Sequence, residues 1–117
     1  MITATTTFET YQTDDVTVIQ FSVAEISHLN HQHVAAELLE IIKPDCPSKL
    51  LFDLKRIHHL PHPGLILLVM LNRIVRANGC RLRLCNLLPQ VQQALERKCL
   101  NRVFAIFDDV LLALHDF

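Results

Sequence analysis

The chain has 117 residues, about half of them hydrophobic, and a formal net charge of −1 with its histidines neutral. A chain of this size can bury a core of its own, which predicts one domain over residues 1–117. The near-neutral charge argues against nucleic acid as a partner, because binding phosphates requires a basic surface. No apolar run approaches the ~20 residues that span a bilayer, and the N-terminus lacks the features of a signal peptide. We therefore expect a soluble, cytoplasmic protein that does not insert into a membrane.

The chain begins with two segments typical of strands. Residues 5–12 (TTTFETYQ) are rich in threonine and aromatic residues, and residues 16–22 (VTVIQFS) are short and β-branched. Residues 13–15, a threonine and two aspartates, have the chemistry of a turn. These features predict an N-terminal hairpin.

A helix and a strand are expected next. Asn30 can cap a helix whose apolar residues recur at helical spacing until Pro44 and Pro47 end it. Residues 49–54 (KLLFDL) then have the composition of a buried strand.

Residues 64–77 predict a second, deeply packed helix, because they are apolar over more than one stripe. Asn78-Gly79 is a suitable left-handed stop for that helix. The residues of this helix that we expect in the core are Leu65, Leu68, Val69 and Leu71.

The C-terminal part alternates strand and helix again. Residues 80–86 (CRLRLCN) place Leu82 and Leu84 on one face, with Arg81 and Arg83 on a face that is at least partly wet. The expected elements that follow are a helix at 89–100, a short strand at 102–107, and a helix at 108–117 with Asp108 and Asp109 at its positive end.

This order predicts an α/β fold, with a mixed, mainly parallel sheet of about five strands, opened by the hairpin and packed against about four helices. The chain has only two glycines, which excludes phosphate loops of the P-loop or Rossmann type. Its four cysteines contain no CxxC pair and predict buried, reduced thiols rather than disulfides.

Histidines are concentrated in front of the two predicted helices. Both clusters follow the carboxyl ends of strands, so they could converge at one edge of the sheet. The residues concerned are His28, His31, His33, His58, His59 and His62. Imidazole suits zinc, copper and nickel, so a metal or small-ligand site is one interpretation; loop histidines facing solvent or a partner are the other. HHxxH on a loop is not an established metal signature, and we expect no cofactor.

The order of elements, together with particular segments, resembles the STAS domain, the fold of bacterial anti-sigma factor antagonists. The segments that carry the resemblance are VTVIQF, LLFDL with Asp53 at the end of the third strand, GLILL opening the second helix, ANGCRLRLCNL, and ALERKCLNRVFAIFDDVLLAL. The resemblance runs from about Val16 to Leu114. It implies a non-catalytic protein-interaction module in transcription regulation, whose partner is an anti-sigma factor that is itself a kinase.

In that family the loop before the second helix carries a D-S-[ST]-G-L signature, whose serine the partner phosphorylates to break the complex. Here Gly64 and Leu65 match the end of the signature, but Pro61, His62 and Pro63 replace its first three positions. The acceptor hydroxyl is therefore missing, although a surface for binding a partner can survive. The partner-binding residues that the resemblance implies are Asp53, His58, His59, Pro61, His62, Pro63, Gly64 and Leu65.

Two alternatives concern single residues. His62 could accept a phosphoryl group in place of the serine. Asp53 could act as a general base or a metal ligand, or it could be a strand-end carboxylate that accepts hydrogen bonds from loop N–H groups. We favour the last of these, because no partner for catalysis is evident in the sequence. We expect no enzymatic activity.

Overall fold

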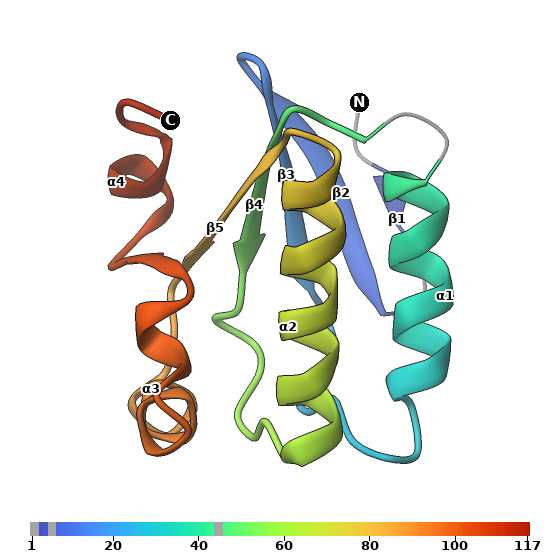
Figure 1. Ribbon diagram of the computed structural model, residues 1–117, viewed down its shortest axis with the longest axis vertical. Helices are drawn as coiled ribbons and strands as arrows, with labels where there is room; N and C mark the ends of the chain where they lie inside the picture. The colour runs from blue at the N-terminus through green and yellow to red at the C-terminus, as the bar shows by residue number, and fades with distance from the viewer. Residues whose placement is uncertain (1–2, 5–6, 44–45) are drawn as a thin grey trace.

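The computed structural model describes residues 3–4, 7–43 and 46–117. Strands and helices alternate after an N-terminal hairpin, as the sequence predicts (Figure 1). The elements are β1 (Thr3–Ala4), β2 (Phe8–Thr13), β3 (Val16–Phe21), α1 (His31–Ile42), β4 (Lys49–Asp53), α2 (His62–Ala77), β5 (Arg81–Cys85), α3 (Pro89–Arg97), the 3₁₀ turn η1 (Leu100–Arg102), β6 (Ala105–Phe107) and α4 (Val110–Leu114).

The strands of the described residues form one mixed sheet of six strands in chain order, β1-β2-β3-β4-β5-β6. The pairs β1–β2 and β2–β3 are antiparallel, and the pairs from β3 to β6 are parallel. The sheet therefore has the mixed, mainly parallel character that was predicted. The β2–β3 turn holds Asp14 at φ +54°, a left-handed conformation that aspartate tolerates. Residues 5 and 6 of the first predicted strand lie outside the described residues.

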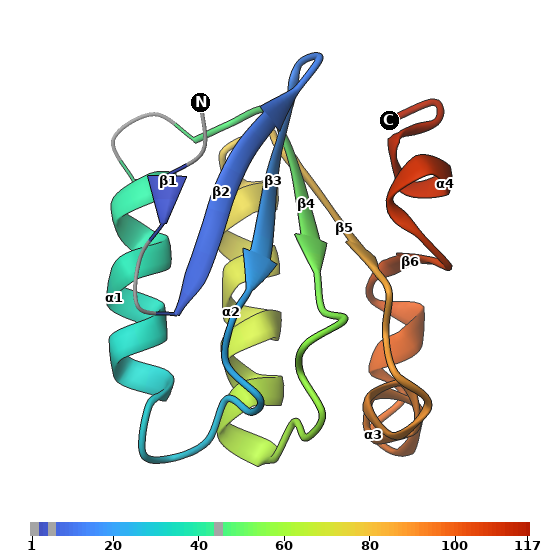
Figure 2. The same ribbon diagram turned by 180° about the vertical axis from the view of Figure 1, so that it is seen from behind.

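Helices cover both faces of the sheet, but unequally. Helices α1 and α2 lie side by side across one face (Figures 1 and 2). Phe21, Phe52 and Leu84 of the sheet pack there against the buried residues of α1, α2 and α3 in the main hydrophobic core. The short helix α4 packs on the other face, over a smaller cluster that includes Leu51 and Cys85. The sheet is thus the middle layer, and its second face is only partly covered by a helix.

Helix α2 is packed on a broad face. Its fully buried residues include Leu68 and Leu71, and Leu65 is also buried, as predicted. Val69 was predicted to lie in the core as well, but it is only half-buried. The helix ends as predicted: Gly79 has φ +75°, and the N–H groups of Gly79 and Cys80 donate to the carbonyls of Arg76 and Val75 at 3.0 Å each.

Helix α1 starts at the predicted place for a different reason. Asn30 occupies the N-cap position, but its side chain makes no capping bond to the helix. Instead its Oδ1 accepts from the N–H of Ser27 at 2.8 Å and its Nδ2 donates to the carbonyl of Glu25 at 2.9 Å. Asn30 therefore braces the β3–α1 loop. Pro44, one of the two predicted helix stops, lies outside the described residues, and α1 ends at Ile42 before it.

The cysteines are not uniformly buried. All four are free thiols, but only Cys85 is buried. Cys46 and Cys80 are half-buried, and Cys99 is exposed beside the end of α3. The prediction of buried thiols was therefore wrong for Cys99, because the residue follows the last turn of α3 and adopts the left-handed φ of +56° outside the core.

Helix α4 is shorter than the predicted helix at 108–117, although an aspartate lies at its start as expected. The carboxylate of Asp109 accepts from the N–H of Leu112 at 2.8 Å, which satisfies one of the free donors at the helix N-terminus. Among the described residues, none of the helices has the length and apolar character that a membrane span requires.

Candidate partner-binding site

The loop from β4 to α2 is an ordered surface feature, held by backbone hydrogen bonds to neighbouring segments. The N–H of Leu54 donates to the carbonyl of Cys85 at 3.0 Å, and the N–H of His58 donates to the carbonyl of Ala24 at 2.7 Å. Ile57 and Leu60 point into the main core. Since buried apolar side chains alternate with exposed histidines, the loop presents a fixed set of polar groups.

Asp53 fixes the start of this loop from inside the protein. The residue is only 3 % exposed. One oxygen, Oδ1, accepts from the backbone N–H of Lys55 and from Nδ2 of Asn86, both at 3.1 Å. This is the strand-end role that we favoured over a general base or a metal ligand. Asp53 therefore links the loop after β4 to the loop after β5.

Gly64 allows α2 to approach the β3–α1 loop closely. A Cβ built on Gly64 would lie 2.6 Å from the carbonyl oxygen of Ile26 and 2.7 Å from Cδ1 of Leu60. Real Cβ atoms do not make contacts this short, and the nearer atom belongs to backbone. The glycine is therefore required by packing, which is a reason for the G of the G-L pair apart from any phosphorylation chemistry.

Helix α2 begins two residues earlier than predicted, at His62, with Pro61 as its N-cap residue. The carbonyl of Pro61 accepts from the N–H groups of Gly64 and Leu65 at 2.9 and 3.1 Å. Pro63 fits the first turn because the N–H that it lacks would have no partner within the helix. The imidazole of His62 is exposed at the point where the helix begins.

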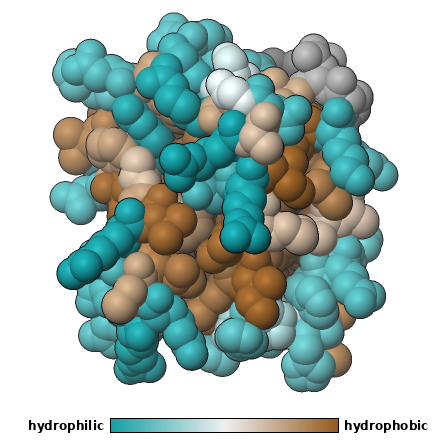
Figure 3. Space-filling model, in the orientation of Figure 1, coloured by the Kyte–Doolittle hydropathy of each residue, from teal (hydrophilic) through white to brown (hydrophobic). Residues whose placement is uncertain are grey.

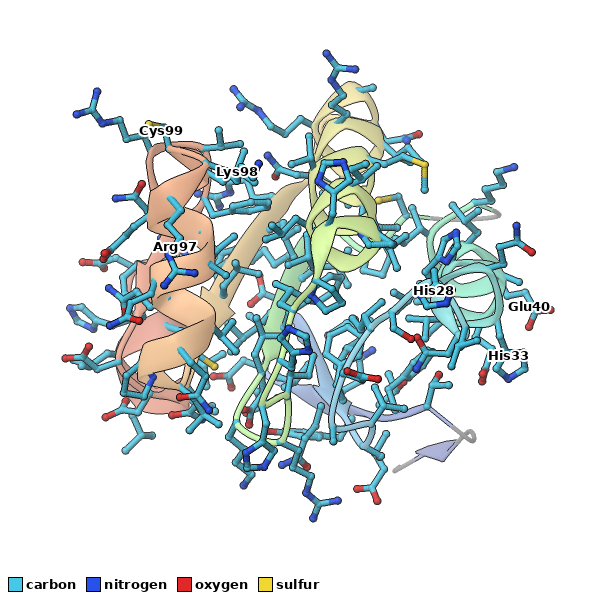
Figure 4. All side chains as sticks on the ribbon, turned by 90° about the horizontal axis from the view of Figure 1, so that it is seen from below. His28, His33, Glu40, Arg97, Lys98 and Cys99 are labelled. Carbon is cyan, nitrogen blue, oxygen red and sulfur yellow. The ribbon has the colours of Figure 1, made fainter. Side chains whose placement is uncertain are left out.

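The six histidines do not form a metal site among the residues that the structure describes, where no group of three or more metal-ligating side chains has suitable geometry. His31 Nδ1 lies 3.1 Å from the carbonyl oxygen of Ser27, and His59 Nδ1 lies 3.1 Å from Oε2 of Glu25. His33 Nε2 lies 2.7 Å from Oε1 of Glu37, one turn further along α1. Figure 4 shows His28 and His33 beside α1, across α2 from the labelled residues of α3. The histidines therefore line one edge of the molecule without converging.

An apolar groove lies beside the loop, between α2 and the residues that directly follow α3. We call it the α2–α3 groove. It has a volume of about 440 Å³, and Leu65, Ile66, Val69, Met70 and Leu100 form its floor. The remaining lining residues, His62, Arg73 and Lys98, are polar and exposed. Figure 3 shows a brown, hydrophobic area between these two helices with hydrophilic side chains along its edge.

A second, more polar hollow of about 330 Å³ adjoins the first and shares Leu65 and Lys98 with it. Its lining includes His58 and His59 from the loop, and it also includes side chains of α3. Those α3 residues are Gln90, Gln93, Ala94 and Arg97. The predicted loop residues thus form one wall of a surface whose other wall is α3.

Sequence reasoning identified the loop but missed α3 and the cations Arg73 and Lys98. One signal was available: α2 was recognised as apolar over more than one stripe, which is more than packing against the sheet requires. The exposure of Ile66 (53 %) and Met70 (38 %) shows where this excess apolar surface lies.

Two ionisable groups, the buried Cys85 and the half-buried Tyr11, lie in the smaller cluster on the second face of the sheet. Burial, and then the negative charges of Asp53 and Asp109, raise the pKa of Cys85 to about 12. Burial, followed by Asp53 and Cys85, also raises the pKa of Tyr11. A thiol with so high a pKa stays protonated at neutral pH and is a poor nucleophile.

Comparison with known proteins identifies the family. Residues 7–113 match the STAS domain, so the chain belongs to the STAS domain family. A comparison with curated proteins gave no match.

Solved structures share the fold at low sequence identity. An anti-sigma factor antagonist (STAS) domain protein from Planctomyces limnophilus is similar with a TM-score of 0.78 and 21% identity, covering 92% of this chain and 94% of the other. The anti-sigma factor antagonist SpoIIAA in its unphosphorylated form has a TM-score of 0.76 and 18% identity, covering 93% of each chain. An anti-sigma factor antagonist from Mycobacterium paratuberculosis has a TM-score of 0.76 and 19% identity, covering 94% of each chain. These likenesses confirm the fold that the sequence predicted.

Proposed function

We propose that this STAS domain is a non-catalytic interaction module that binds a kinase-type anti-sigma factor, or a related signalling partner, in the bacterial cytoplasm. We further propose that serine phosphorylation in the β4–α2 loop cannot switch this binding off. The observation that carries the proposal is a loop that is ordered and exposed at the start of α2, yet contains no Ser, Thr or Tyr from Lys55 to Gly64.

The residues of the proposed contact have two roles. His58, His59 and His62 are exposed and would touch the partner, with Pro61 and Pro63 shaping the backbone between them. Asp53, Gly64 and Leu65 are buried and would set the shape of the surface. Two prolines restrict the chain around His62, so less conformational entropy is lost when a partner binds.

The test is a binding and phosphorylation assay with kinase-type anti-sigma factors of the source organism. We expect a stable complex with and without ATP, and no phosphate on residues 55–64 by mass spectrometry. A triple variant, Pro61→Asp with His62→Ser and Pro63→Ser, restores a family-like acceptor. It should become phosphorylated and leave the partner, because a dianionic group in an acidic or apolar interface is repelled and resists desolvation.

The matched control changes the same positions without adding a hydroxyl: Pro61→Asp with His62→Ala and Pro63→Ala. It should stay bound in the presence of ATP. Release of the unaltered protein by ATP, with phosphate mapped to His62, would replace the permanently engaged module with a phosphohistidine switch. If no anti-sigma factor of the source organism binds the unaltered protein, the proposed kinase-type partner is wrong.

A further inference from the structure

The α2–α3 groove combines exposed apolar residues with uncompensated positive charge. Ile66 is 53 % exposed and Met70 is 38 % exposed, one turn apart on the same side of α2. Together with Val69 and Leu100 they form an apolar floor. Removing this apolar surface from water is favourable. An exposed apolar patch with a polar rim is typical of a protein interaction site.

The rim of the groove is basic. Arg73 lies on α2. Lys98 directly follows α3, and Arg97 at the end of α3 lines the adjoining hollow (Figure 4). None of these three cations takes part in an ion pair within the described part of the chain, where the ion pairs join other residues. Among the residues that the structure describes, no aspartate or glutamate lines either hollow, and Glu96, the acidic residue of α3, lies outside both linings. This region is thus positive although the whole chain has a net charge of −1.

We propose that the α2–α3 groove binds an acidic amphipathic helix of a protein partner, with the helix's apolar side on Ile66 and Met70 and its carboxylates toward Arg73, Arg97 and Lys98. Apolar anchors at helical spacing are the usual way in which a helix occupies such a groove. Carboxylates would supply the counter-charges that the rim lacks, which favours an acidic partner over a basic one. The inference deepens the proposed function only by naming the chemistry of its partner; it does not require that the partner be a kinase.

The polar hollow next to the groove favours a peptide over a lipid. Gln90 and Gln93 carry amide groups that can donate to and accept from the polar groups of a peptide. An acyl chain passing over the same amides would remove them from water without offering hydrogen bonds, which costs free energy. A fatty acid could contact the apolar floor and pair with one cation. It would leave the amide groups of Gln90 and Gln93 without hydrogen-bond partners.

The first experiment is a selection of 16-residue peptides displayed on phage against the immobilised protein, with counter-selection on the Ile66→Asp variant. We expect enriched peptides that carry a net negative charge and have apolar residues at i, i+3 or i+4, and i+7. The proposal would be overturned if basic peptides were enriched, or if the enriched peptides lacked apolar residues at helical spacing. It would also be overturned if no enriched peptide depended on Ile66.

The second experiment measures the affinity of one enriched peptide by fluorescence anisotropy. Ile66→Asp should weaken binding roughly tenfold or more, since a central apolar anchor is lost. Lys98→Glu should also weaken it roughly tenfold, because repulsion replaces attraction. The matched controls are Leu111→Asp, an exposed leucine on α4, and Lys43→Glu, an exposed lysine at the end of α1. Both controls should leave the affinity within about twofold.

A readout on the unaltered protein does not depend on the folding of any variant. Affinity for the acidic peptide should fall as salt rises, while a peptide with its acids changed to glutamine should bind weakly at every salt concentration. An unchanged affinity in high salt, equal binding of the glutamine peptide, or equal effects of the Lys98 and Lys43 variants would refute the charge complementarity. Failure of the kinase assay above leaves these outcomes unaffected, so the two proposals can fail separately.

Discussion

The guanidinium carbon of Arg83 lies 4.4 Å from the centroid of the Phe117 ring. The side chain of this β5 residue therefore stacks on the C-terminal segment, on the second face of the sheet. A second ring, that of Phe107, lies 4.7 Å away. The same guanidinium donates three hydrogen bonds of 2.9 Å to the carbonyl oxygens of Ala113, His115 and Asp116. Arg83 therefore anchors α4 and the residues after it to the sheet.

Replacing Arg83 with alanine should reduce the free energy of unfolding by about 2 kcal/mol, because hydrogen bonds from a charged donor and the stacking on two rings are lost. The control is Arg81→Ala, an exposed arginine of the same strand and face that lies 5.8 Å from the Phe117 ring. That change should cost less than about 0.5 kcal/mol. Urea unfolding checks both values, and equal losses would show that Arg83 does not hold α4.

Gly64→Ala should destabilise the protein by about 1–3 kcal/mol, although alanine is the better helix former. The added Cβ would meet the carbonyl oxygen of Ile26 at 2.6 Å, so either α2 or the β3–α1 loop must shift. Gly79→Asn provides a comparison, since no atom lies within 4 Å of its Cβ position and asparagine tolerates the φ of +75°. Thermal unfolding should show the larger loss for Gly64→Ala; an increase in stability would contradict the packing argument.

The raised pKa of Cys85, about 12, gives stability a defined dependence on alkaline pH. The unfolded thiol loses its proton near the ordinary value of 9.0, whereas the folded thiol keeps it. The stabilisation is therefore fully present below about pH 9 and is lost as pH rises to about 12. Between pH 7.5 and 10.5 it should account for a loss of about 2 kcal/mol.

Urea unfolding at pH 7.5 and pH 10.5 measures this effect as a difference between the unaltered protein and Cys85→Ala. The variant should lose less stability over that interval, whatever its stability at pH 7.5. Parallel losses in the two proteins would mean that the thiol titrates normally in the folded state.

The histidine-lined edge should not retain metal. Purification without a histidine tag, followed by dialysis and elemental analysis, should find zinc, copper and nickel far below a stoichiometric amount, since the described histidines do not converge on a common point. A stoichiometric metal that is lost in a His58→Ala, His62→Ala double variant, but kept in His115→Ala, would instead favour the metal-binding interpretation.

Local sequence patterns were sufficient to predict most of the fold. Period-two alternation placed Leu82 and Leu84 in the core, and Asn78-Gly79 ended α2 as expected. These signals are short-range, because they depend on the pleat of a strand and on the conformational freedom of glycine. The parallel sheet followed from the alternation of strands and helices.

The contacts that give particular residues their roles were decided by the tertiary structure. The same alternation that buried Leu84 left Arg83 on the face predicted to be partly wet, and only the position of α4 shows that its guanidinium is engaged with Phe117 and three carbonyls. Asn30 looked like a cap, but the path of the β3–α1 loop brings Ser27 and Glu25 to its side chain instead. A side chain's partners come from segments that are distant in the chain or shaped by loops, and no local periodicity encodes these distances.

The candidate site also has some features that the sequence determined and others that only the tertiary structure decided. The sequence by itself determined that residues 55–64 contain no hydroxyl acceptor, since this is a matter of composition. It also indicated that α2 has more apolar surface than one packing face needs. Only the folded chain places Lys98 and Leu100 beside Ile66 and Met70, about 30 residues away in sequence, to make a groove with a basic rim. The physical reason is that the groove lies between α2 and the segment after α3, and the distance between them is set by the packing of both helices on the sheet.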